Sequence, residues 1–92
     1  MINNQNTPTK ILAVEGSRAV RIVIEKAFQD YACIVHESGN GKEALKYLER
    51  ERPDVILLGT TMHVMDGIET LKCIQSNANL KMIPILVITA EA

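Results

Sequence analysis

The stretch from residue 53 to residue 67 constrains the fold of this chain most strongly, because it combines the signals of a strand, a loop and a helix. Its apolar run Val55–Leu58 lies between Pro53 and Gly59, which predicts a short buried strand. In open α/β sheets, ligands bind at the carboxyl ends of the strands. The residue at this strand tip is Gly59, so the tip can shape the backbone but offers no side chain that donates, accepts or coordinates.

The residues after the loop predict a helix with a defined start. Asp66 is an acidic N-cap, and Glu69 stands at the third helical position, which is the pattern of a capping box. The apolar residues that follow have helical spacing: Ile68, Leu71 and Ile74. The loop therefore joins the carboxyl end of a strand to the start of a helix.

The rest of the chain continues this alternation. Apolar runs predict strands at 11–14, 32–36 and 83–89, and helical spacing predicts helices at 18–29 and 42–50. The sequence Gly39-Asn40-Gly41 predicts a turn and lacks the spacing of a nucleotide-binding loop. Strands that alternate with helices predict an α/β fold with a parallel sheet and right-handed crossovers.

The helix at 18–29 has a polar start and two distinct faces. Ser17 is the expected N-cap. The apolar side expected to face the sheet consists of Val20, Val23, Ile24, Ala27 and Phe28, and the opposite side carries Arg18, Arg21, Glu25 and Lys26.

Length and charge limit the classes of function. Ninety-two residues allow one domain, expected at 10–92 after a loose polar tail at 1–9. A net charge of −1 gives no electrostatic sign of nucleic-acid or anionic-lipid binding. No apolar run approaches the roughly 18 residues that a membrane span needs. Because Cys33 and Cys73 have no metal-type spacing, we expect reduced thiols in a cytoplasmic protein.

Four motifs, in order along the chain, resemble the receiver domain of bacterial response regulators. They are KILAVEGSRAVR, GNGKEAL, LLGTTMHVMDG and IPILVITA, and they extend from Lys10 to Ala90. The resemblance implies a flavodoxin-like, three-layer fold, with the strands present here in the order 2-1-3-4. It also implies a role in two-component signalling, where an Asp at the tip of the third strand accepts a phosphoryl group.

The resemblance assigns family roles to four positions, of which two have lost their carboxylate. Glu15 and Gly16 match the acidic pair that holds Mg²⁺, Gly59 the phosphoryl acceptor, and Thr89 the switch hydroxyl. One carboxylate makes a poor Mg²⁺ site, so we expect no cofactor, and Gly59 offers no nucleophile. Asp at both glycine positions would restore the family motif, which suggests an inactivated receiver that is not an enzyme.

Other polar residues near this pocket give weaker alternatives. Glu15 and His63 are the remaining metal candidates, but two ligands do not make a site. A phosphoryl group could instead be accepted at Glu15 or at a loop hydroxyl, Thr60 or Thr61. His36 is expected at the surface.

The sequence ends at Ala92, just after the fourth strand, so the family's fourth helix, fifth strand, fifth helix and the Lys of that strand are not in it. We therefore expect strand 83–89 to be an apolar sheet edge that pairs with another chain, most simply a copy of itself. The predicted interaction surface consists of Ile85, Leu86, Val87, Arg18 and Arg21. Three hypotheses remain: a protein-binding receiver, a receiver with a displaced acceptor, and an inactive fragment of a longer regulator.

Overall fold

The computed structural model describes residues 7–59, 62 and 65–88. Strands and helices alternate along the chain, as the sequence predicts. The elements are β1 (Thr9–Val14), α1 (Arg18–Phe28), β2 (Cys33–Ser38), α2 (Gly41–Leu48), β3 (Val55–Gly59), α3 (Gly67–Gln75) and β4 (Ile85–Ile88).

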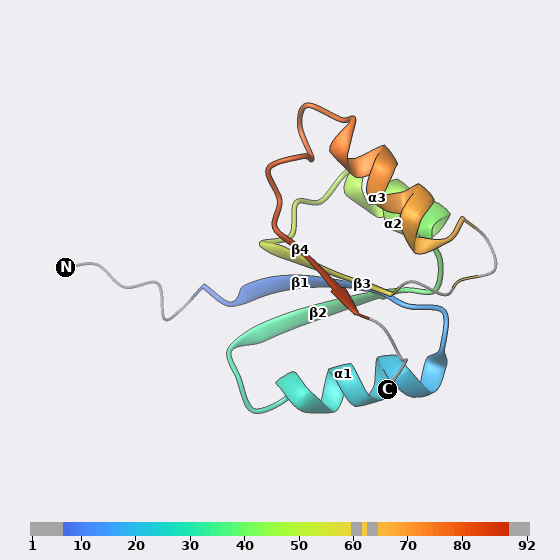
Figure 1. The fold of residues 1–92 in the computed structure, drawn as a ribbon. Helices are drawn as coiled ribbons and strands as arrows, with labels where there is room; N and C mark the ends of the chain where they lie inside the picture. Colours follow the sequence, from blue (N-terminus) through green and yellow to red (C-terminus); the bar gives the residue numbers. More distant parts are fainter. Residues whose placement is uncertain (1–6, 60–61, 63–64, 89–92) are drawn as a thin grey trace.

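The four strands form one parallel sheet in the order β2-β1-β3-β4. Helix α1 covers one face of the sheet, and α2 and α3 lie together over the other face (Figure 1). The expected α/β fold with three layers and strand order 2-1-3-4 is confirmed. Because the central strands are parallel, with Val14 level with Leu58, the exit of β1 lies beside the tip of β3.

Each face of the sheet has its own apolar core, since side chains alternate between the faces along a strand. Between the sheet and helices α2 and α3 lies a core that includes Leu12, Ile56, Leu58 and Ile74. The core between the sheet and α1 is smaller and consists of Ile11, Ala13, Ile24 and Leu57, with partly buried neighbours. The continuous apolar runs of β1 and β3 thus serve both cores.

The helix starts follow the predicted capping residues. The Ser17 hydroxyl accepts the Val20 N–H at 3.2 Å. At α3, the Asp66 carboxylate accepts the Glu69 N–H at 2.9 Å, and the Glu69 carboxylate accepts the Asp66 N–H at 3.3 Å. This capping box fixes the point at which the loop after β3 becomes helical.

The predicted inner face of α1 is wrong at two positions. Val23 is 65% exposed and Ala27 is also exposed. The stripe that meets the sheet consists of Val20, Ile24 and Phe28, which are spaced four residues apart. Val23 and Ala27 each precede a stripe residue by one position, about 100° around the helix, so they lie beside the contact.

Element bounds differ slightly from the sequence prediction. Strand β2 continues to Ser38, two residues past the predicted end, and β4 begins at Ile85 although the buried Ile83 precedes it. Within the described residues, none of the helices is long and apolar enough to cross a membrane.

Candidate functional site

The predicted pocket lies where β1 and β3 end next to each other. Glu15 leaves β1, and its carboxylate lies directly over Gly59. A Cβ atom built on Gly59 would overlap Glu15 Oε1, and it would also lie 3.0 Å from Glu15 Cδ and 3.2 Å from the Val14 carbonyl oxygen. The structure therefore brings Glu15 and Gly59 together as predicted, and places a carboxylate where a side chain at position 59 would begin.

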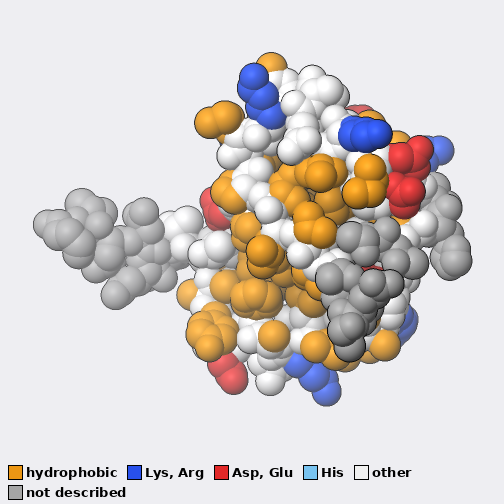
Figure 2. Space-filling view, in the orientation of Figure 1, with side chains coloured by type: hydrophobic (Ala, Val, Ile, Leu, Met, Phe, Trp, Pro, Cys, Tyr) orange, Lys and Arg blue, Asp and Glu red, His pale blue; other side chains and the backbone are white. Residues whose placement is uncertain are grey.

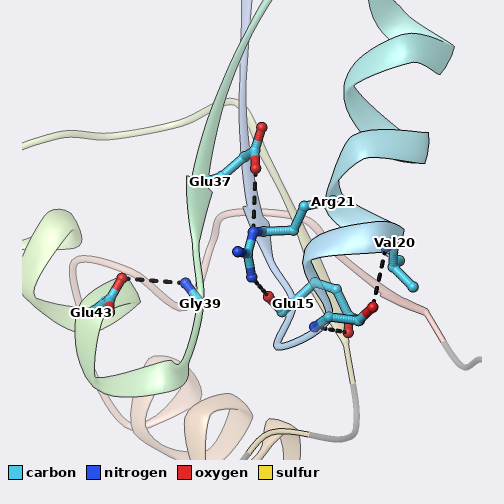
Figure 3. Close-up of polar contacts among 7 residues, drawn as sticks. Glu15, Val20, Arg21, Glu37, Gly39 and Glu43 are labelled. Atoms are coloured by element: carbon cyan, nitrogen blue, oxygen red, sulfur yellow. Dashed lines mark hydrogen bonds and ion pairs between the residues drawn. The ribbon is translucent and has the colours of Figure 1, made fainter.

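Local hydrogen bonds hold Glu15 in this position. The Ser17 backbone N–H donates to Glu15 Oε2 at 2.9 Å, and the Glu15 N–H donates to the Ser38 carbonyl oxygen at 3.0 Å. The Arg21 guanidinium donates to the Glu15 carbonyl oxygen at 2.5 Å (Figure 3). Both the backbone and the side chain of Glu15 are thus tied to neighbouring elements.

Arg21 connects three elements at this end of the sheet. Its Nε lies 3.3 Å from Glu37 Oε1 on β2. Its Nη1 donates to the Glu15 carbonyl oxygen at the end of β1 (Figure 3). Its side chain is 20% exposed. We predicted Arg21 as part of a partner surface, and the structure shows it in intramolecular contacts. Its pairing with Glu37 depends on the packing of α1 against β2, which no local sequence pattern predicts.

A second close contact joins the starts of α2 and α3. The Gly41 N–H donates to the Met65 carbonyl oxygen at 3.3 Å, and Thr70 Oγ1 donates to the Asp66 carbonyl oxygen at 2.8 Å. A Cβ atom on Gly41 would overlap Thr70 Oγ1 and lie 2.8 Å from Met65 Cγ. Met65 has a φ of 56°, in the left-handed region that non-glycine residues rarely adopt. The end of the β3–α3 loop is therefore fixed against α2.

The donor set at the strand tips does not fit a magnesium site. Gly16 and Gly59 have no side chain, and the Glu15 carboxylate is bonded to Ser17. No group of three or more His, Cys, Asp or Glu residues comes together in the parts of the chain that the structure describes. The predicted positions Thr60, Thr61, His63 and Thr89 lie outside the described residues.

His36 lies away from this pocket, exposed on β2, as expected. Its ring stacks on Tyr47 of α2 with the ring centroids 4.0 Å apart. Burial, with a smaller contribution from the Glu51 charge, raises the pKa of Tyr47 above its ordinary value. This contact joins the outer strand β2 to helix α2.

The predicted interaction strand β4 is apolar and accessible. Leu86 is 60% exposed and Val87 is 50% exposed, while Ile85 is half-buried. Apolar side chains gather on the face of the molecule where β4 lies, between α1 and the α2–α3 layer (Figure 2). Ile22 and Val23 add exposed apolar surface on α1. Arg18, at the start of α1, is exposed as predicted.

Comparison with known proteins agrees with the fold. The family model for the response regulator receiver domain matches residues 11–92. Response regulator MprA from Mycobacterium leprae is 36% identical over 82 residues, covering 89% of this chain and 35% of MprA. Sporulation initiation phosphotransferase F from Bacillus subtilis is 38% identical over 63 residues, covering 68% of this chain and 51% of the relative. The chain thus spans between about a third and a half of these relatives.

Solved structures show the same architecture. The chemotaxis protein CheY4 of Vibrio cholerae has 34% identity and a TM-score of 0.84, with 92% of this chain and 71% of that chain covered. Phosphorylated cyanobacterial phytochrome response regulator RcpA has 32% identity and a TM-score of 0.87, with coverages of 91% and 66%. The receiver domain of the sensor histidine kinase PA1611 of Pseudomonas aeruginosa, with a magnesium ion coordinated in its active site cleft, has 30% identity and a TM-score of 0.86, with coverages of 92% and 70%.

Proposed function

The chain belongs to the response regulator receiver domain family, and we propose that it is a two-component signalling domain that works without phosphorylation at the usual acceptor position. The observation that carries this proposal is Gly59 at the tip of β3, the position to which the resemblance assigns the family's acceptor Asp. Phosphoryl transfer to a receiver requires a carboxylate oxygen that attacks phosphorus. Gly59 has no such atom.

The surroundings of Gly59 support this proposal. The residues at the neighbouring strand exit supply one carboxylate, Glu15, and its oxygens face the Ser17 N–H and the space above Gly59. A divalent cation that neutralises phosphoryl charge usually needs more anionic ligands than this. We therefore propose that the domain is not an enzyme and has no Mg²⁺ cofactor, in contrast to the magnesium-bound receiver of PA1611.

The same pocket contains the observation that favours the alternative of a displaced acceptor. The Glu15 carboxylate occupies the place next to the missing acceptor, so Glu15 is the described residue at which phosphorylation would be sought. Incubation with an acyl phosphate and Mg²⁺, followed by intact-mass measurement, separates the two functions. The proposal expects no phosphoryl group on the wild-type chain. The alternative expects one, which disappears in Glu15→Gln if Glu15 is the acceptor and remains if a loop hydroxyl is the acceptor.

Signalling without phosphorylation requires a protein surface, and we propose the β4 edge with α1 beside it. Strand β4 is the outermost strand on its side of the described sheet, and an outer strand presents N–H and C=O groups that can pair with another strand. Its exposed side chains Leu86 and Val87 are apolar. A second copy of the chain fits this edge in the simplest way, because two-fold pairing of identical strands forms a closed dimer.

We propose a domain at residues 10–92 that follows a tail at 1–9 and acts in the cytoplasm through a protein partner, with no nucleic-acid or membrane partner. MprA and the other curated relatives contain more chain than is matched here, so a longer regulator is a further possible setting for this domain.

A further inference from the structure

Glu15 and Gly59 occupy overlapping space although they lie on different strands. Glu15 Oε1 stands within the volume that a Cβ atom at position 59 would take, and Glu15 Cδ is 3.0 Å from that point. The two positions are adjacent because β1 and β3 pair in parallel, with Val14 level with Leu58. A side chain at position 59 therefore cannot coexist with Glu15 in its present conformation.

The present conformation of Glu15 is stabilised by specific contacts. Glu15 Oε2 accepts the Ser17 N–H at 2.9 Å, at the residue that caps α1. The Arg21 guanidinium holds the Glu15 carbonyl oxygen, and Glu37 holds Arg21 in turn. Because the Glu15 side chain is flexible, a group at position 59 could push it aside, but the bond to Ser17 would be lost.

We propose that Glu15 fills the acceptor position from the neighbouring strand, so that its Ser17-bonded conformation and any side chain at position 59 exclude each other. This inference rests on the proposed function, since a receiver that is not phosphorylated at position 59 does not need an open pocket there. The Glu15 carboxylate thereby fills the space above Gly59 and links the tip of β3 to the start of α1.

If Glu15 fills this space, replacing Gly59 with alanine should destabilise the protein, which is the opposite of the usual effect of this substitution. Where the backbone conformation suits both residues, alanine is normally more stabilising than glycine, because glycine loses more conformational freedom on folding, and Gly59 does not have a positive φ. Gly59→Ala should nevertheless lower the urea midpoint of unfolding, since its methyl group displaces the Glu15 carboxylate. The Val14 carbonyl, 3.2 Å from the new atom, adds crowding that does not depend on Glu15.

A double-mutant cycle separates the two causes. It compares the wild-type chain, Gly59→Ala, Glu15→Ala and the double variant by urea unfolding and by the NMR resonance of the Ser17 amide. We expect Gly59→Ala to lower the midpoint and shift the Ser17 resonance in the wild-type background. In the Glu15→Ala background, the drop in midpoint should be smaller or absent, and the Ser17 resonance should not move further.

Matched variants test whether the effect belongs to this pair. Glu15→Gln keeps the bulk and an acceptor oxygen, so Gly59→Ala should remain as costly in that background. Gly41→Ala meets Thr70 and Met65, which lie apart from Glu15, so its cost should be the same with Glu15 and with Glu15→Ala. Gly39→Ala should leave the Ser17 resonance unchanged, because its Cβ would have an ordinary 3.6 Å contact with Arg21.

Equal midpoint shifts for Gly59→Ala in both Glu15 backgrounds, or an unmoved Ser17 resonance, would overturn the proposal. If Gly59→Ala does not fold, folding of the double variant supports the proposal and failure of the double variant contradicts it. The proposed function fails by a different result, namely phosphorylation of the wild-type chain, so the two failures are distinguishable.

Discussion

Arg21 Nε on α1 lies 3.3 Å from Glu37 Oε1 on β2, and Arg21 Nη1 donates to the carbonyl oxygen of Glu15 at the end of β1. One guanidinium thus links a helix to two neighbouring strands beside the pocket. The planar group of arginine, with several donors in a fixed arrangement, is suited to such bridging.

Replacing Arg21 tests this bridge. Arg21→Ala removes a charge-assisted bond to a carbonyl and an ion pair that water partly screens, so we expect a loss of about 1–2 kcal/mol in the free energy of unfolding. Arg18→Ala, at an exposed position of the same helix, should change it by less than about 0.5 kcal/mol. Equal losses for the two variants in urea denaturation would show that the bridge contributes nothing specific.

Gly41 tests the contact between the starts of α2 and α3. Gly41→Ala places a methyl group against Thr70 and the backbone of Met65, which should cost about 1–3 kcal/mol of unfolding free energy. The matched variant is Gly39→Ala, where the new atom has an ordinary contact. A Gly41→Ala chain as stable as the Gly39→Ala chain would contradict the close packing described for this loop.

Alkaline stability tests the environment of Tyr47. Because its folded pKa lies above the ordinary value of 10.0, its stabilising contribution is present below that value and is lost as pH rises through the folded pKa. Unfolding free energy should therefore fall with pH above about 10, less steeply in Tyr47→Phe, which cannot ionise. Glu51→Gln removes the smaller cause of the raised pKa, so it should also make the alkaline fall in unfolding free energy less steep, by less than Tyr47→Phe does. An unchanged alkaline slope in Tyr47→Phe would contradict this account.

A charge on the outer strand tests the partner surface. Leu86→Lys places an ammonium group on the exposed part of β4, where it should weaken self-association, while the fold is retained because Leu86 is 60% exposed. Ile34→Lys is a matched control, since Ile34 is similarly exposed but lies on β2, the strand at the opposite edge of the described sheet. Equal effects of the two variants in analytical ultracentrifugation would remove β4 as the specific surface.

The sequence predicted the fold because its local signals agree with one another. Pro53 and Gly59 bound a continuous apolar run, and Asp66 with Glu69 marks the start of α3, so strand, loop and helix could be assigned from neighbouring residues. The position of Gly59 next to Glu15 followed from the parallel order of the strands. Resemblance to receivers added the strand order that local patterns leave open.

The finer contacts depend on how separate elements pack, which local patterns do not determine. The pairing of Arg21 with Glu37 and the fit of Gly41 against Thr70 join residues on different elements. The exposure of Val23 depends on the narrow stripe that α1 presents to the sheet, which an apolar face read from the sequence overestimates. The same holds for the Glu15 side chain, whose direction no spacing predicts.

Association through the β4 edge without phosphorylation can be tested by the solution mass of the wild-type chain, measured by light scattering over a dilution series with and without an acyl phosphate and Mg²⁺. We expect a dimer that dissociates on dilution to the same extent in both conditions, because association uses the β4 edge and position 59 accepts no phosphoryl group. A monomer at all concentrations, or a dimer that forms only after treatment with the phosphodonor, would contradict it.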